Sequence, residues 1–66
     1  MKALLKAKKE GYRDQWVTIN KDNKLTTCSI YNNSEEFAAE LNPTQIEELC
    51  NYRGKSKLYD VVLIVN

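Results

Sequence analysis

The 66-residue sequence predicts a small α+β domain with a mainly antiparallel four-stranded sheet (β-β-β-α-α-β) and two short helices packed on one face. Three observations lead to this fold class. Two stretches rich in β-branched and aromatic residues, Trp16–Ile19 and Leu25–Tyr31, flank a polar turn. Two helix-start patterns follow within residues 33–54. A strongly apolar stretch, Leu58–Val65, comes after them.

Residues 1–9 permit two interpretations. They are good helix formers, and Gly11 suits the position after a helix end. They also alternate, with Met1, Ala3, Leu5 and Ala7 on one side. A nine-residue helix without an N-cap is marginal in isolation, so we expect a strand, with a helix as the alternative.

The run KAKKEGY at residues 6–12 resembles the opening of many short phage-encoded β-rich proteins. The resemblance covers seven residues and names no family. It implies a phage or other mobile element as the source.

The next two stretches predict a β-hairpin. With Asp22 and Asn23 as a two-residue loop, Ile19 lies opposite Thr26 and Val17 lies opposite Cys28. Because side chains alternate along a strand, this register predicts a core face with four members. They are Val17, Ile19, Cys28 and Ile30.

Two short helices are predicted after the hairpin. Asn33, with Glu36 three residues later, fits a capping box at the start of the first helix. The second begins at Asn42-Pro43-Thr44-Gln45, where a cap residue precedes a proline and a glutamine takes the box position. Gly54 is a natural stop for this helix.

The last strand is the most apolar, so we expect it inside the sheet, next to the first strand. One side of it is an uninterrupted apolar row that we place beneath the helices: Tyr59, Val61, Leu63 and Val65. Val62 and Ile64 then lie on the opposite face, beside Leu4 and Trp16. Little of the chain is left to cover that second face.

Length and composition indicate one compact domain over residues 1–66, with 42% hydrophobic and 29% charged residues. A chain of this size buries only about 60% of the surface that its unfolded form exposes, so its stability is marginal. No run approaches the roughly 20 apolar residues of a membrane span, and no signal peptide is recognisable. We expect a soluble, cytoplasmic protein.

Catalytic and metal-binding residues are scarce. The sequence has no histidine, the usual general base, and its two cysteines, Cys28 and Cys50, form no CxxC pair. We expect reduced thiols, with a disulfide as the alternative. An enzyme, a cofactor and a metal site are not expected.

The net charge of +1 is spread unevenly along the chain. Residues 1–24 have seven Lys/Arg and three Asp/Glu (+4), residues 25–52 have five glutamates and no basic residue (−5), and residues 53–66 have a charge of +2. The acidic middle suggests a minor possibility, a helix surface that imitates nucleic acid. Its members would be Glu35, Glu36, Glu40, Glu47 and Glu48.

The incompletely covered sheet face predicts a non-enzymatic protein-binding module, either self-associating as a homodimer or acting as an inhibitor or adaptor. The predicted partner-binding residues are Leu4, Lys6, Arg13, Trp16, Thr18, Tyr31, Val62 and Ile64. A secondary basic and aromatic cluster comprises Tyr52, Arg53, Lys55 and Lys57.

The alternative function is single-stranded nucleic-acid binding, with bases stacked on Trp16 between lysines. The sequence pI of about 7.7 argues against it, because nucleic-acid-binding domains usually have a pI above about 9.

Overall fold

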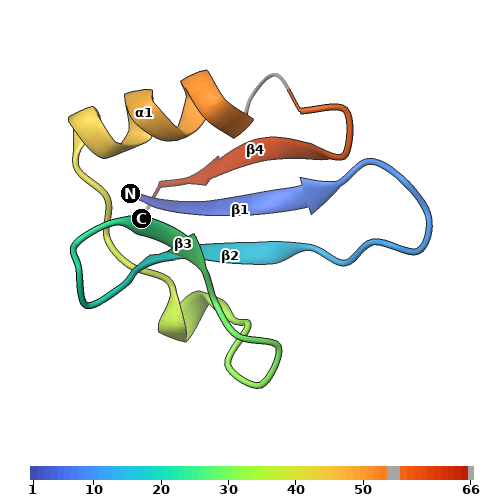
Figure 1. Cartoon of the computed structure of the whole chain (residues 1–66), viewed down its shortest axis with the longest axis horizontal. Coiled ribbons are helices and arrows are strands. Elements are labelled where there is room, and N and C mark those ends of the chain that lie inside the picture. The colour runs from blue at the N-terminus through green and yellow to red at the C-terminus, as the bar shows by residue number, and fades with distance from the viewer. Residues whose placement is uncertain (54–55, 66) are drawn as a thin grey trace.

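A computed structural model describes residues 1–53 and 56–65 of the chain. Four antiparallel strands form one sheet in the spatial order β3-β2-β1-β4 (Figure 1). The strands are β1 (Lys2–Ala7), β2 (Gln15–Ile19), β3 (Leu25–Thr27) and β4 (Tyr59–Ile64). The helical elements are α1 (Pro43–Arg53) and the 3-10 turn η1 (Glu35–Phe37). The predicted α+β class and four-stranded antiparallel sheet are confirmed, and the first segment is a strand.

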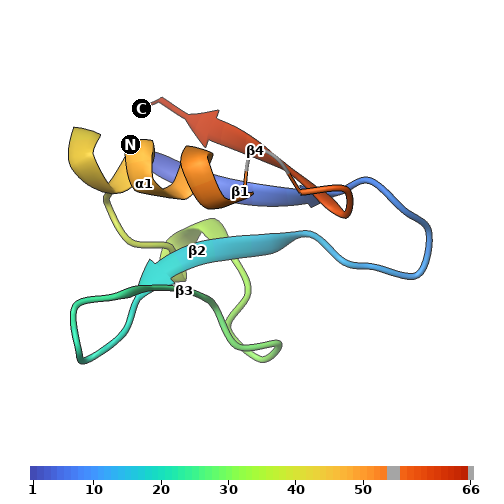
Figure 2. The same cartoon turned by 45° about the horizontal axis from the view of Figure 1, so that its top comes forward.

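The hydrophobic core lies between the sheet and α1. Its buried members are Ala3, Leu5, Val17, Leu41 and Leu49, with Ile19, Leu25, Ala39, Ile46, Tyr59 and Val61 packed against them. Alternation along β1 turns Ala3 and Leu5 towards α1 and leaves Leu4 on the other side. Figure 2 shows α1 crossing in front of the sheet. The opposite side of the sheet is called the far face below.

The predicted hairpin register is wrong by one residue. Val17 pairs with Thr27 and Ile19 pairs with Leu25. Asn20 N–H donates to Lys24 C=O (2.9 Å), which leaves residues 21–23 as a three-residue turn. The Asn20 side chain accepts hydrogen bonds from the backbone N–H groups of Asp22 (2.9 Å) and Lys24 (3.0 Å). Asn23 adopts φ +61°, the left-handed conformation that ends such a turn and that asparagine tolerates.

The shift in register changes the core. Leu25 takes the place beside Ile19, while Cys28 moves to the far face and Ile30 becomes exposed. The strand also ends at Thr27 instead of continuing to Tyr31. Beyond Thr27 the backbone keeps one more bond to β2, from Cys28 N–H to Trp16 C=O (2.8 Å), and then turns away.

The first predicted helix is a single 3-10 turn, so only one helix packs on the core face. The side chain of the expected cap residue, Asn33, instead bonds to β2. Its Oδ1 accepts a hydrogen bond from Trp16 N–H (2.8 Å). Ser34 occupies the position before η1 and makes no side-chain cap bond. Without that cap, and with only three residues of helical geometry, the segment does not extend into a helix.

The second predicted helix start is confirmed. Asn42 Oδ1 accepts from Gln45 N–H (2.8 Å), and Gln45 Oε1 accepts from Asn42 N–H (2.9 Å). This reciprocal pair satisfies two backbone donors at the start of α1, and Pro43 occupies the first helical position. The predicted stop at Gly54 lies outside the described residues.

The last strand pairs with β1 as expected, from Lys2 opposite Ile64 to Ala7 opposite Tyr59. Its position inside the sheet is wrong, because β4 is an edge strand. Apolar composition gave the wrong position because β4 is apolar on both faces, yet among the described strands only β1 pairs with its backbone. The predicted division of its side chains holds for Tyr59 and Val61, which pack against the core, and for Val62, which lies opposite Leu4. It is wrong for Leu63 and Val65, which are exposed.

Candidate protein-interaction surface

An apolar row crosses the far face of the sheet. Leu4 lies opposite Trp16 in the β1–β2 pair and opposite Val62 in the β1–β4 pair. All three side chains are half-buried. The row therefore joins three of the predicted partner-binding residues, and Ile64 continues it along β4, opposite Lys2.

The other predicted partner-binding residues are more scattered. Thr18 lies on the far face opposite Thr26, and the exposed Lys6 lies there opposite Asp60. Arg13 is exposed in the connection between β1 and β2, and Tyr31 lies in a turn beyond β3. In the secondary cluster Lys57 is exposed, whereas Lys55 and the side chains of Tyr52 and Arg53 lie outside the described part of the molecule.

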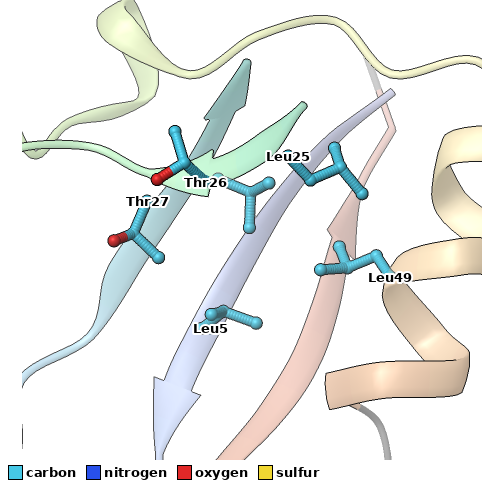
Figure 3. A pocket seen from close by; sticks show the side chains of 6 residues that line it. Leu5, Leu25, Thr26, Thr27 and Leu49 are labelled. Atoms are coloured by element: carbon cyan, nitrogen blue, oxygen red, sulfur yellow. The ribbon is translucent and has the colours of Figure 1, made fainter. Parts of the chain in front are cut away.

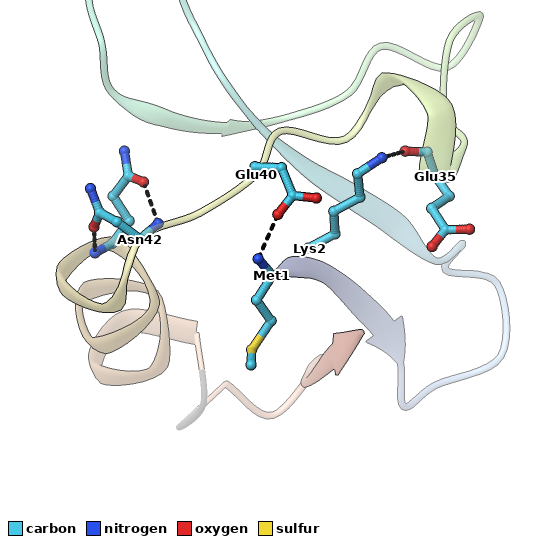
Figure 4. A network of polar contacts seen from close by, with 6 residues as sticks. Met1, Lys2, Glu35, Glu40 and Asn42 are labelled. Atoms are coloured by element: carbon cyan, nitrogen blue, oxygen red, sulfur yellow. Dashed lines mark hydrogen bonds and ion pairs between the residues drawn. The ribbon is translucent and has the colours of Figure 1, made fainter. Parts of the chain in front are cut away.

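Residues 33–38 cover part of the far face near β2. From β1, Lys2 Nζ donates to Glu35 C=O (2.7 Å), and Cys28 Sγ donates to Phe37 C=O (3.6 Å). Asn33 Nδ2 donates to Asp14 C=O (2.8 Å), so this side chain ties the loop to β2 at two points together with its bond to Trp16. Figure 4 shows Lys2 reaching Glu35 at η1. The backbone of Trp16 is thus held against a loop of its own chain.

The turn Ser29–Asn32 presents two apolar side chains to solvent. Asn32 N–H donates to Ser29 C=O (3.1 Å), which places Ile30 and Tyr31 at the tip of the turn. Ile30 is 62% exposed and Tyr31 is 89% exposed. Tyrosine at such a site is typical of interface anchors.

The free side of β4, called the β4 edge here, is the feature that sequence reasoning missed. Lys8 N–H donates to Leu58 C=O (2.8 Å), which fixes the hydrogen-bonding pattern of the β1–β4 ladder. The even-numbered residues from 58 to 64 direct their backbone groups at β1, so Tyr59, Val61 and Leu63 direct theirs outward. Within the described part of the chain, no hydrogen bond reaches these outward groups.

Apolar side chains accompany this unpaired backbone. Leu63 is 37% exposed and Val65 is 74% exposed, although both were expected beneath the helices. Asp60 is the single charged residue of the strand, and it forms an ion pair with Lys8 (3.4 Å). Natural edge strands are usually protected from pairing with other chains by charges, prolines or bulges. An exposed apolar edge strand of this length is a template for another strand.

Two ionisable groups are perturbed by identifiable contacts. The amino group of Met1 lies 2.6 Å from Glu40 Oε2, and its hydrogen bond lowers the pKa of Glu40, an effect that its charge reinforces (Figure 4). Burial raises the pKa of the Cys28 thiol, so the thiolate form is disfavoured. Both cysteines are free.

A small cavity lies between the sheet and α1 (Figure 3). Its volume is about 30 Å³, and its walls are Leu5, Val17, Leu25, Thr26, Thr27 and Leu49. Ligand pockets are usually about 300–1,000 Å³, so this one is a packing defect of water size. In residues 1–53 and 56–65, no group of three metal-ligating side chains comes together, and no helix there is long and apolar enough to cross a membrane.

Comparison of the chain with protein-family models, with curated proteins and with solved structures finds no match. The function is therefore inferred from the contacts and the exposed surfaces described above.

Proposed function

We propose that the chain is a small non-enzymatic protein-binding module that engages its partner by strand addition. The observation that supports this most directly is the β4 edge. There, exposed apolar side chains accompany the outward backbone groups of Val61 and Leu63, which have no hydrogen-bond partner among residues 1–53 and 56–65. An added strand satisfies such backbone groups and gives affinity, while the alternating side chains give specificity.

The chemical groups of the molecule favour binding over catalysis. The cavity described above is water-sized, and both aliphatic and threonine residues line it. Glu35, Glu36, Glu47 and Glu48 are all exposed on the surface. The Cys28 thiol, with its raised pKa, is a poor nucleophile. These features support a protein-binding function, which takes the form of either self-association or an inhibitor or adaptor role.

A pair of charge variants tests the proposal. Leu63→Lys places a cation on the β4 edge, a device that natural edge strands use against pairing. Thr26→Lys adds the same charge to the exposed side chain of Thr26 on β3, at the other edge of the sheet. Both variants should fold, because neither side chain is buried.

The measurement is affinity capture with tagged chain, followed by identification of every retained protein, including untagged copies of the chain. Proteins retained by the wild type and by Thr26→Lys but lost with Leu63→Lys support binding through the β4 edge. An identical retained set for all three baits contradicts it.

A further inference from the structure

We infer that the partner of the β4 edge is a second copy of this chain, whose β4 pairs antiparallel about a two-fold axis at Val62. This inference rests on the proposed function and names the partner for the same edge. It predicts one continuous sheet made of both four-stranded sheets, with both α1 helices on the same side.

The backbone pattern permits self-pairing without rearrangement. In an antiparallel pair, residues that face each other with both backbone groups exchange two hydrogen bonds. The outward residues of β4 are odd-numbered, so an odd residue of one copy must lie opposite an odd residue of the other. Val61 opposite Leu63 of the second copy meets this condition, and the two-fold axis generates the same pair again.

Repulsion between like charges excludes one of the registers that place odd-numbered residues opposite each other. Centring the pair on Asp60 brings two carboxylates directly opposite each other, which is destabilising. Centring it on Val62 instead places each Asp60 opposite Ile64 of the second copy. Asp60 also keeps Lys8 as its ionic partner within its own chain (3.4 Å).

The far-face row favours the register centred on Val62. Trp16, Leu4 and Val62 already lie side by side across three strands. With Val62 opposite its own copy, the row continues through Leu4 and Trp16 of the second chain. A shift of the axis to Val61 interrupts the row, because Asp60 then lies opposite Val62.

The opposite face supports the same register. Val65, which is 74% exposed, lies opposite Tyr59 of the second copy, and Leu63 lies opposite Val61. Aromatic and β-branched residues form favourable cross-strand pairs. The pairing therefore covers the two most exposed apolar side chains of residues 59–65, Leu63 and Val65.

The first experiment measures the mass of the purified chain in solution by sedimentation equilibrium across a concentration series. The inference predicts a shift from 7.7 kDa towards twice that value with rising concentration. Leu63→Lys should weaken the association by about tenfold or more, and Thr26→Lys should leave it unchanged. A mass of 7.7 kDa at every concentration overturns the inference, whereas loss of an unrelated partner with Leu63→Lys would still support the proposed function.

The second experiment fixes the register by single-cysteine cross-linking. In a background with Cys28→Ser and Cys50→Ala, the variants Val61→Cys, Val62→Cys and Leu63→Cys are oxidised and resolved on non-reducing gels. Directly opposed residues of a non-hydrogen-bonded pair have Cα atoms about 4.5 Å apart, within the range of a disulfide. Fastest dimer formation by Val62→Cys supports the inference, and fastest formation by either neighbour overturns this register.

Discussion

Leu4 lies directly opposite Trp16 on the sheet face that α1 does not cover, while its neighbour Leu5 points into the core. Two adjacent leucines thus have different surroundings, one half-buried and one fully buried. Trp16 is the only tryptophan of the chain, so its emission reports on the far face alone.

We expect Leu5→Ala to destabilise the domain by about 2–5 kcal/mol, because it removes a fully buried side chain and leaves a cavity. Leu4→Ala should cost less, about 1–2 kcal/mol, because Leu4 is only half-buried. It should also shift the Trp16 emission of the folded protein to longer wavelength. Urea unfolding followed by circular dichroism and fluorescence measures both effects. Equal costs for the two variants would contradict the assignment of faces.

Asn33→Ala should destabilise the domain by about 1–3 kcal/mol, because it leaves the Trp16 N–H and the Asp14 C=O without their side-chain partner. The matched control is Asn32→Ala, at an exposed neighbouring position that should change stability by a few tenths of a kcal/mol. Thermal unfolding of the two variants, with amide exchange at Trp16, makes the comparison. Unaltered exchange at Trp16 in Asn33→Ala would show that this bond does not hold the loop on β2.

Asn42→Ala should cost about 1 kcal/mol, because Gln45 N–H then loses its capping oxygen. Asn51→Ala, at an exposed position inside α1, is the control and should be neutral or slightly stabilising. Urea midpoints at constant slope give the difference. A control that is destabilised as much as Asn42→Ala would point to helix composition instead of the cap.

The start of α1 was predictable because a cap depends on residues three positions apart, and Asn42, Pro43 and Gln45 have no competing partners. The pattern at Asn33 was equally good locally. There, the Asn33 side chain instead accepts a hydrogen bond from Trp16, a residue of β2 that is distant in sequence. Local patterns therefore predicted a helix start correctly only where no tertiary contact engaged the cap residue.

The alternation of β1 and β4 was strong enough to place Val62 and Leu4 on one face and Val61 on the other. Strand order was not predictable, since apolar composition does not reveal which side of a strand has a neighbour. The hairpin register failed because both kinds of turn place Asn23 in the left-handed conformation. A two-residue type I′ turn needs that conformation at Asp22 as well, and of these two residues only Asn23 adopts it. The β4 edge was not predicted for the same reason: apolar composition does not show which side of a strand lacks a neighbour.

The ion pair between Met1 and Glu40 gives a prediction for acid stability. The folded-state pKa of Glu40 lies below its ordinary value of 4.5, because the Met1 amino group donates a hydrogen bond to it. The pair therefore contributes stability above pH 4.5, and the contribution is lost as the pH falls through the lower folded-state pKa. Carboxyl chemical shifts of Glu40 against pH measure this directly. Acetylation of the Met1 amino group should return the pKa towards 4.5, and an unchanged titration after acetylation would assign the shift to another group.

Single-stranded nucleic acid should not alter Trp16 emission at micromolar protein, at either low or high salt. Trp16 is half-buried beside the loop held by Asn33, and Lys2 and Lys8 already contact Glu35 C=O and Asp60. Quenching that weakens steeply with salt would instead support the alternative function, because phosphate contacts release counterions. In that case Lys6→Glu, at an exposed far-face position, would reduce the quenching.

The pairing of β1 with β4 also governs how the chain folds. Opposed residues are separated by 52 positions (Ala7 and Tyr59) to 62 positions (Lys2 and Ile64), so closing this ladder requires a long loop. Hairpins form in about 1–10 μs, whereas domains dominated by distant contacts fold in milliseconds to seconds. On the ribosome, β1 emerges first yet gains this neighbour only after β4 has been synthesised. Until then the backbone groups of β1 that face β4 lack this strand partner.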